Sequence, residues 1–196
     1  MGRRSDHSRA ELEALMLQAG QHLLAEVGLA RFSAREVAKR VGYSVGTIHN
    51  VFGGYDPLVT AINTQTFARW TQALRARLAG EDGDRIAALI EGYFAFAREH
   101  TALWTAIFDH RLPPGAELTP ADHEVRGQLT EIVVREVAGA LGRPASPAIE
   151  SLARSLIATV HGHCAFALTG SFALMGETAP EAMALARVRE SLAAAA

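Results

Sequence analysis

The sequence predicts an all-α protein, and three observations support this fold class. Apolar residues recur every three or four positions over most of the 196 residues, which is the spacing of amphipathic helices. Ser, Thr and Asp residues that can cap helices precede these runs, and glycines or prolines stand between them. No Asn-Gly or Asp-Gly turn separates two alternating runs, so strands are not expected.

Three capping signals divide the N-terminal part of the chain into three helices. Ser8-x-x-Glu11 and Ser33-x-x-Glu36 have the spacing of capping boxes, and Ser44 can cap a third helix. Glycines end the first two helices. The helices expected from these signals cover residues 9–27, 34–41 and 45–51.

Six longer helices are expected in the rest of the chain. Each begins at a capping residue, often followed by proline at the first helical position, and ends before a glycine or proline. The expected starts are Asp56-Pro57, Asp82 or Asp84, Thr101, Thr119-Pro120, Ser146-Pro147 and Thr178-x-x-Glu181 with Pro180 inside it.

Composition and charge limit the functions that are compatible with this sequence. The hydrophobic content of 49% suffices for a sizeable core, and the net charge of −2 excludes a general polycation. Residues 1–56 hold seven Lys/Arg and six Asp/Glu, a net charge of +1. Residues 57–196 hold twelve and fifteen, a net charge of −3. This difference permits nucleic-acid binding at the N-terminal end without requiring it.

The expected location is the cytoplasm. Cys164 is the only cysteine, so no intrachain disulfide can form and a reducing compartment is the simplest choice. No apolar run reaches the roughly 18 residues that a membrane span needs, and the charged N-terminal stretch does not read as a signal peptide. The chain also lacks a phosphate-binding loop, a nucleophile motif and H-E-x-x-H, so neither an enzyme nor a cofactor is expected.

The second and third helices have the pattern of a helix-turn-helix. Each is about two turns long, and Gly42-Tyr43-Ser44 joins them. Helices this short are not stable alone and must pack on the first helix. The third helix carries small and polar residues, which allow its backbone to approach base pairs, while Ile48 and Phe52 are expected to face inward.

The stretch "FSAREVAKRVGYSVGTIHNVFGGYDPLVTAI", residues 32–62, resembles the DNA-binding domain of the tetracycline-repressor (TetR) family. The resemblance implies a DNA-binding domain over residues 1–56 and a ligand-binding and dimerisation domain over 57–196. It implies that Ser33 and the first N–H groups of the second helix hold a phosphate, that Arg35 reaches a base edge, and that Asn50 can pair with adenine. The implied DNA contacts are Ser33, Arg35, Lys39, Ser44, Val45, Gly46, Thr47, His49, Asn50 and Tyr55. Lys39, and Arg40 in addition, are weaker candidates for backbone contacts.

Two positions depart from the family pattern. Members usually carry Tyr where His49 stands and Lys where Tyr55 stands. His49 can still donate a hydrogen bond to a phosphate. Tyr55 can also donate a hydrogen bond, but its hydroxyl is uncharged, unlike the ammonium group of Lys. One charge pair with the DNA backbone is therefore expected to be missing.

Aromatic residues gather in the middle of the chain. The family resemblance implies that the central helices enclose a small-molecule site, for which the candidates are Trp70, Tyr93, Phe96, Trp104, Phe108, His161 and Phe166. Plain core packing is the alternative for each aromatic residue in this set.

The stretch "ATVHGHCAFALTG", residues 158–170, resembles the His-Gly-containing segment of one branch of TetR-like C-terminal domains, although that branch usually has Trp where Thr159 stands. His161 and Cys164 lie three apart on one helical face, as a zinc ligand pair can. No partner cluster is visible, so no metal site is expected. A metal- or redox-responsive regulator that uses this pair remains an alternative.

The resemblance implies a homodimer that binds an inverted-repeat operator and is released by a small apolar or aromatic effector, that is, a repressor. Helices over 147–170 and 180–194 are the implied dimer interface. Their apolar stripes include Ala153, Leu156, Ile157, Val160, Cys164, Leu168, Met183, Ala186 and Leu192, and sequence alone does not separate interface from core. The second alternative is a ligand-binding protein that no longer binds DNA.

Overall fold

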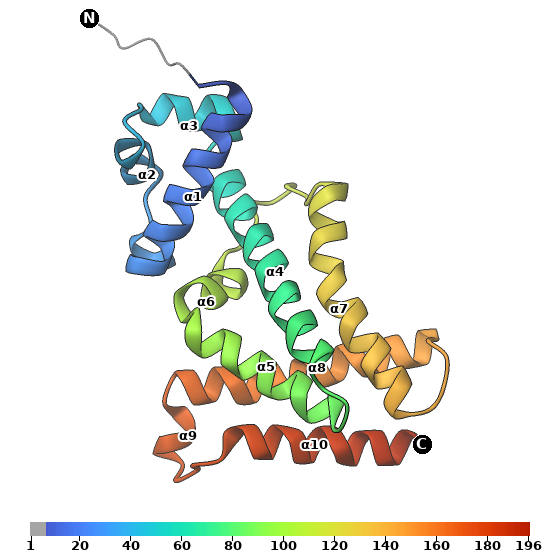
Figure 1. The fold of residues 1–196 in the computed structure, drawn as a ribbon. Helices are drawn as coiled ribbons and strands as arrows, with labels where there is room; N and C mark the ends of the chain where they lie inside the picture. Colours follow the sequence, from blue (N-terminus) through green and yellow to red (C-terminus); the bar gives the residue numbers. More distant parts are fainter. Residues whose placement is uncertain (1–6) are drawn as a thin grey trace, which may run out of the picture. The chain divides into compact units, whose positions relative to one another are not determined.

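A computed structural model describes residues 7–196, and the first six residues of the predicted N-terminal domain lie outside the described residues. It confirms the all-α prediction: residues 7–196 form ten α-helices and one short 3-10 helix and contain no strand (Figure 1). The elements are α1 (Arg9–Val27), η1 (Leu29–Arg31), α2 (Ala34–Arg40), α3 (Val45–Phe52), α4 (Tyr55–Ala79), α5 (Arg85–Glu99), α6 (Thr101–Asp109), α7 (Pro120–Ala140), α8 (Pro147–Leu168), α9 (Ser171–Leu174) and α10 (Pro180–Ala195).

The chain divides into two compact units. The first contains the residues up to Thr66 together with Ala102–Asp122, and the second contains Phe67–Thr101 and His123–Ala196. Nearly all of α6 therefore belongs with the N-terminal helices. These units differ in extent from the predicted domains 1–56 and 57–196, which are a functional division and stay a prediction.

The first unit is built around one apolar core under α1, α2 and α3. Met16 and Leu24 of α1, Val37 of α2 and Ile48 of α3 are all fully buried in it. Leu58, Val59 and Ile62 from the start of α4 join the same core, as do Leu103 and Ala106 of α6. This packing stabilises two helices that are too short to persist alone.

Four of the nine predicted capping signals form as predicted. The capping box of Ser8 and Glu11 is formed at α1, Asp84 accepts a hydrogen bond from Ala87 N at α5, and Ser146 accepts one from Ile149 N at α8. Thr119 Oγ1 accepts from Asp122 N, 3.1 Å away, at the start of α7.

Four start signals work differently from the prediction. Ser33 makes no side-chain cap at α2, and the Glu36 carboxylate lies 3.7 Å from Lys39 Nζ and 3.8 Å from Arg40 Nε. Ser44 also makes no cap. Further along the chain, α4 begins at Tyr55, ahead of the predicted Asp56 cap. The Thr101 hydroxyl donates back to Ala97 O, so it does not cap α6.

Near the C-terminus, two helices differ from the prediction. α10 begins at Pro180 without a side-chain cap, so Thr178 does not start it as predicted. The short helix α9 was not predicted as a separate element, because its four residues are too few to show a helical period.

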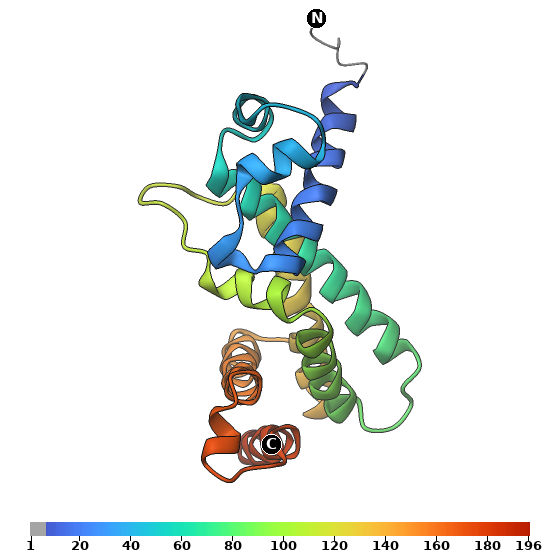
Figure 2. The ribbon, with the colours of Figure 1, turned by 90° about the vertical axis from the view of Figure 1, so that its left-hand side faces the viewer.

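The second unit packs the end of α4 with α5, α7, α8 and α10. α8 and α10 are antiparallel neighbours joined through α9, and Figure 2 shows both nearly end-on. The buried face of α8 consists of Ile149, Ala153, Leu156, Val160 and Cys164. This stripe is buried within the chain, so it forms core rather than an outer surface.

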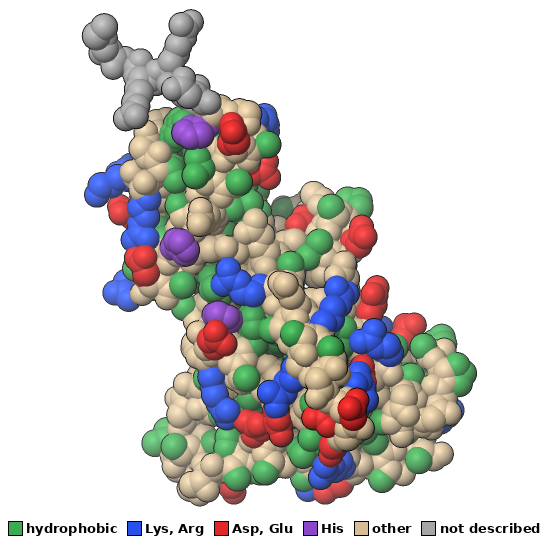
Figure 3. Space-filling model, viewed as in Figure 1, with side chains coloured by type: hydrophobic (Ala, Val, Ile, Leu, Met, Phe, Trp, Pro, Cys, Tyr) green, Lys and Arg blue, Asp and Glu red, His purple; other side chains and the backbone are tan. Residues whose placement is uncertain are grey.

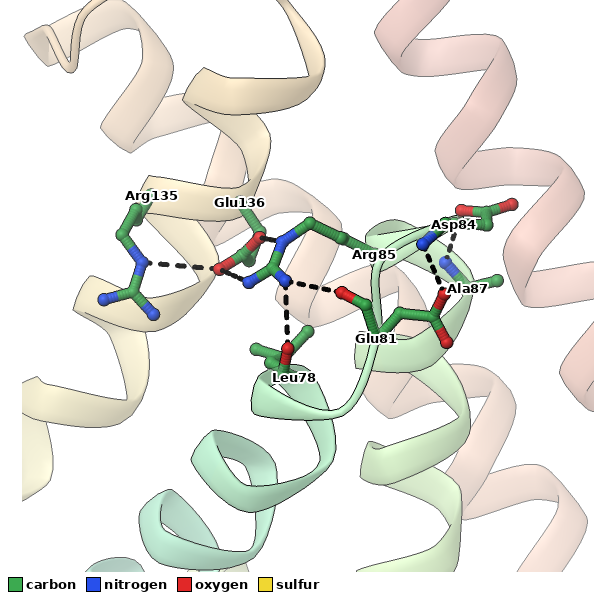
Figure 4. A network of polar contacts seen from close by, with 8 residues as sticks. Leu78, Glu81, Asp84, Arg85, Ala87, Arg135 and Glu136 are labelled. Atoms are coloured by element: carbon green, nitrogen blue, oxygen red, sulfur yellow. Dashed lines mark hydrogen bonds and ion pairs between the residues drawn. The ribbon is translucent and has the colours of Figure 1, made fainter.

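A polar network fastens three helices of the second unit (Figure 4). The Arg85 guanidinium donates two hydrogen bonds to the Glu136 carboxylate, at 2.7 and 3.0 Å. It also donates to the carbonyl oxygens of Leu78 and Glu81, at 2.9 and 3.0 Å. One guanidinium thus joins the end of α4, the start of α5 and α7, and Arg189 of α10 pairs with Asp84 at the same end of α5.

Candidate nucleic-acid interface

α2 and α3 each bury one face and expose the other. Val37, Ala38 and Ile48 are at most 1% exposed and hold the two helices to the core. Among the predicted DNA contacts, Ser33 and Thr47 are half-buried and the remainder are exposed. The exposed set is Arg35, Lys39, Ser44, Val45, Gly46, His49, Asn50 and Tyr55.

The start of α3 presents an open backbone. A Cβ added at Gly46 would meet a single neighbouring atom within 4 Å, Ser44 Oγ at 3.5 Å. Ser44 Oγ and Thr47 Oγ1 lie 3.2 Å apart across the first turn. Because neither Ser33 nor Ser44 uses its hydroxyl as a cap, the first N–H groups of both helices stay available for an anionic partner.

The three cationic residues of α2, Arg35, Lys39 and Arg40, differ in the acidic partners that they contact. Arg40 makes a two-pronged pair with Glu26 of α1, at 2.9 and 2.7 Å, and this pair raises the pKa of Arg40 and lowers that of Glu26. Lys39 lies 3.7 Å from a Glu36 carboxylate oxygen. Within residues 7–196, Arg35 has no acidic partner within ion-pair distance. Figure 3 shows Lys and Arg side chains mixed with acidic ones along the edge where α2 runs.

These contacts rank the predicted cations. Arg40, a weaker candidate from the sequence, pairs with Glu26 of α1 at the surface, so its guanidinium is already engaged. Arg35 is exposed and is therefore the strongest candidate for a base or phosphate contact.

His49 and Tyr55, the two departures from the family pattern, both lie near the end of α3. The His49 ring lies 3.6 Å from where a Gly54 Cβ would stand, so it lies over the α3–α4 link. Tyr55 packs against Phe32, with ring centroids 5.8 Å apart. Partial burial and the neighbouring Asp56 raise the pKa of Tyr55, so its hydroxyl is a neutral donor at pH 7.

Two residues that the sequence analysis did not single out, His7 and Arg9, contact the α2–α3 turn and α3. His7 Nδ1 lies 2.9 Å from the Tyr43 hydroxyl in the α2–α3 turn, and Arg9 donates to Val51 O of α3 at 3.2 Å. These contacts join residues 36 and 42 positions apart, so no local spacing could have signalled them. They hold the turn and the end of α3 from the side of α1.

Four of the predicted ligand contacts come together in the second unit. Trp70 stacks on Phe96, with centroids 5.1 Å apart, and meets Tyr93 edge-on at 4.7 Å. The Tyr93 hydroxyl lies 3.0 Å from His161 Nδ1 of α8, and burial lowers the pKa of His161, so its ring is neutral at pH 7. The Trp70 indole N–H is buried and has no hydrogen-bond partner among residues 7–196.

The other three predicted ligand contacts do not join that cluster. Trp104 and Phe108 pack on each other in the first unit, with centroids 5.1 Å apart. Phe166 of α8 is 49% exposed, and its ring centroid lies 5.5 Å from that of Phe172. The predicted set therefore consists of a cluster in the second unit, a pair in the first and one surface residue.

Cys164 is fully buried, and burial raises the pKa of its thiol to about 12. Across residues 7–196, no group of three or more His, Cys, Asp or Glu lies close enough to hold a metal ion. No helix in this part of the chain combines the length and apolar character that crossing a membrane requires.

Comparison with family models gives two matches. Residues 16–62 match the model of the bacterial regulatory proteins of the tetR family, and residues 86–190 match that of the tetracycline repressor-like C-terminal domain. The second match alone spans just over half of the chain. The narrower likeness to a His-Gly-containing branch stays a prediction.

Individual proteins resemble this chain in sequence or in fold. The HTH-type transcriptional regulator BetI 2 of Chromohalobacter salexigens is 34% identical over 83 residues, which cover 40% of each chain. A Rhodococcus sp. RHA1 protein of unknown function shares the fold at 23% identity, with a TM-score of 0.74 over 98% of both chains. RolR, solved in complex with resorcinol, shares it at 17% identity, with a TM-score of 0.68 over 94% of this chain and 92% of RolR.

Proposed function

Because the chain belongs to the tetracycline-repressor (TetR) family of transcriptional regulators, we propose that it is a repressor that binds an inverted-repeat operator as a homodimer. A small effector molecule releases it from DNA. We place this activity in the cytoplasm, where the operator is accessible.

One observation carries the DNA-binding part of the proposal. The exposed face of α3 offers small and polar groups around an open backbone at Gly46, and Arg35 is exposed on the neighbouring helix α2. An α-helix with such a face fits the major groove, and an arginine can bind a guanine edge with two hydrogen bonds. Ser33, Lys39, Thr47, His49, Asn50 and Tyr55 surround this face as proposed phosphate or base contacts.

The outward face of α8 supports the homodimer. Ala158, Gly162 and Phe166 are four residues apart and all exposed, and a Cβ at Gly162 would meet nothing within 4 Å. Helices approach closely where small residues line such a stripe, and aromatic residues such as phenylalanine are enriched in protein interfaces. α10 packs beside α8, so helices 147–170 and 180–194 form the proposed interface.

The cluster of Trp70, Tyr93, Phe96 and His161 supports an aromatic or apolar effector. It combines buried aromatic rings, a neutral imidazole and an indole N–H that no acceptor among residues 7–196 engages, groups that suit an uncharged ring that carries a hydrogen-bond acceptor. RolR, a relative in fold, binds resorcinol. Trp104, Phe108 and Phe166 stay candidate contacts outside this cluster.

A gel-shift titration against the DNA upstream of the gene, with a salt series, tests the proposal. We expect retardation at low salt and a steep loss of affinity as salt rises. A folded dimer that does not retard this DNA at low salt would refute the repressor function and leave a ligand-binding protein that no longer binds DNA.

The same titration separates the metal- or redox-responsive alternative. Cys164 is buried and its thiol has a pKa of about 12, so it is a poor thiolate ligand and a slow target for peroxide. We expect operator binding to be unchanged by a zinc chelator or by peroxide. A loss of binding with either reagent would support a sensor built on His161 and Cys164.

A further inference from the structure

The start of α4 is connected to the recognition helix by two residues only. Gly53 and Gly54, with φ of 90° and 146°, lie between the end of α3 and Tyr55. Gly53 N donates to His49 O at 2.9 Å, and Leu58 N donates to Gly54 O at 3.3 Å. Because this link is short and bonded to both helices, a shift of the first turn of α4 is passed on to the end of α3.

A histidine at the end of α6 holds that first turn. His110 Nε2 lies 3.1 Å from Asp56 Oδ1, and the His110 side chain is only 7% exposed. Its backbone N–H donates to Ala106 O at 3.1 Å, which continues the helical bonding of α6 by one residue. The imidazole therefore projects from an ordered helix end.

α6 is itself fixed to the core of the same unit. Leu103 and Ala106 are buried among the residues that support α2 and α3. The Asn63 amide of α4, 1% exposed, donates to Ala106 O at 3.2 Å. These contacts give His110 a rigid base from which to hold Asp56.

The first turn of α4 is held by core packing on one face and borders a hollow elsewhere. Leu58 and Val59 are fully buried in the core of the first unit. A hollow of about 390 Å³ is lined by Asp56, Pro57, Thr60 and Ala61 of α4 and by Leu112, Pro113 and Ala116 of the loop before α7. The hydrogen bond from His110 adds a directional contact at Asp56, where side chains leave this space unfilled.

We propose that His110 is a positioning residue for operator binding: through Asp56 it fixes the first turn of α4 and, through the two-glycine link, the recognition helix. This role rests on the proposed DNA-binding function. His110 need not touch DNA, and it acts through Asp56.

Removing the charge of Asp56 tests the positioning role. Electrostatic repulsion from DNA and a positioning role predict opposite changes in DNA affinity for this variant. Asp56 follows Tyr55, a proposed phosphate contact, so electrostatics alone predicts that Asp56→Ala binds DNA more tightly. A positioning role predicts weaker binding, by about tenfold, because a charge-assisted hydrogen bond is lost. Asp56→Asn keeps an acceptor oxygen and should bind at least as tightly as the wild type.

Variants of His110 test the other partner of the same hydrogen bond. His110→Leu removes the donor and should weaken binding about as much as Asp56→Ala, whereas His110→Gln can keep an N–H near the carboxylate and should recover most of the affinity. The double variant Asp56→Ala/His110→Leu should bind no more weakly than either single variant, because both remove the same interaction. Asp109→Ala removes an exposed neighbouring acid and serves as the control, with no loss of affinity.

The probe is labelled DNA from upstream of the gene, titrated with full-length dimer and monitored by fluorescence anisotropy. Circular dichroism melts establish that each variant is folded at the assay temperature. Asp56→Ala binding as tightly as the wild type, or the two single losses adding in the double variant, would overturn the positioning role. Failure of the wild type to bind would instead refute the proposed function on which the role rests.

Discussion

Glu136 of α7 offers a sharp test of how the second unit is held together (Figure 4). Its side chain is 5% exposed and accepts two hydrogen bonds from Arg85, at 2.7 and 3.0 Å. Glu136→Gln keeps the size of the side chain but removes its charge. The Arg85 guanidinium then keeps one good acceptor, the oxygen of the new amide, in place of a carboxylate.

The size of the effect follows from the geometry. A hydrogen bond to a charged group contributes about 1.5–3 kcal/mol. The Arg85 side chain is 42% exposed, so water screens the pair, and we reduce the expected loss for Glu136→Gln to about 1–2 kcal/mol. For a chain of this length each kcal/mol corresponds to about 2–4 °C, so Tm should fall by roughly 2–8 °C at pH 7.

The pH dependence has a definite sign. The hydrogen bonds from Arg85 are the main cause that lowers the pKa of Glu136 below its usual value of 4.5. A carboxyl group with a depressed folded-state pKa stabilises the fold above its unfolded pKa, and this contribution is lost as pH falls through the folded value. The wild type should therefore lose its advantage over Glu136→Gln as the pH is lowered below about 4.5.

Thermal unfolding followed by circular dichroism from pH 7 downward measures both effects. Glu131→Gln on the same helix is the control, because Glu131 is exposed and should change Tm little. Equal Tm values for wild type and Glu136→Gln at pH 7, or a difference that does not shrink in acid, would refute the reasoning.

Three predictions concern DNA binding. Arg35→Ala should cost about 1–3 kcal/mol of operator affinity and relax the preference at one base pair, measured by anisotropy with a set of singly substituted operators; an equal loss on all sequences would assign Arg35 to phosphate instead. Gly46→Leu should raise Tm, since leucine favours helix by up to about 1 kcal/mol over glycine, while it abolishes operator binding by filling the open face of α3; retained binding would remove this face from the interface. Tyr55→Lys should steepen the slope of log K against log salt by about one unit, and an unchanged slope would show that position 55 lies away from phosphate.

The fold class was predictable from the sequence because helical periodicity and caps are local signals. Ser8 with Glu11, and Thr119 with Asp122, form caps within one turn, as their spacing predicts. Ser33 with Glu36 has the same spacing but forms no side-chain cap, and Glu36 instead lies within ion-pair distance of Lys39 and Arg40. The spacing of a capping box therefore predicts where a helix starts better than it predicts the cap hydrogen bonds.

The candidate site was predictable in part. A small, polar recognition helix and its turn show in the sequence, and the structure places these residues on an exposed face. The sequence offers no sign that Arg40 is committed to Glu26, or that Arg35 meets no acidic partner in the described part of the chain, because Glu26 belongs to another helix. Which cation is available for DNA depends on contacts between helices.

The sequence by itself determined the all-helical class, most helix starts and the identity of the helix-turn-helix, because each depends on residues a few positions apart. Only the tertiary structure decided that α6 packs with α1–α4, that the stripe through Cys164 is core, and that His110 meets Asp56. These facts depend on pairs of residues far apart in the chain. Such pairs meet only when all the helices bury their apolar faces together, and no periodicity in one helix records the partner that it will find.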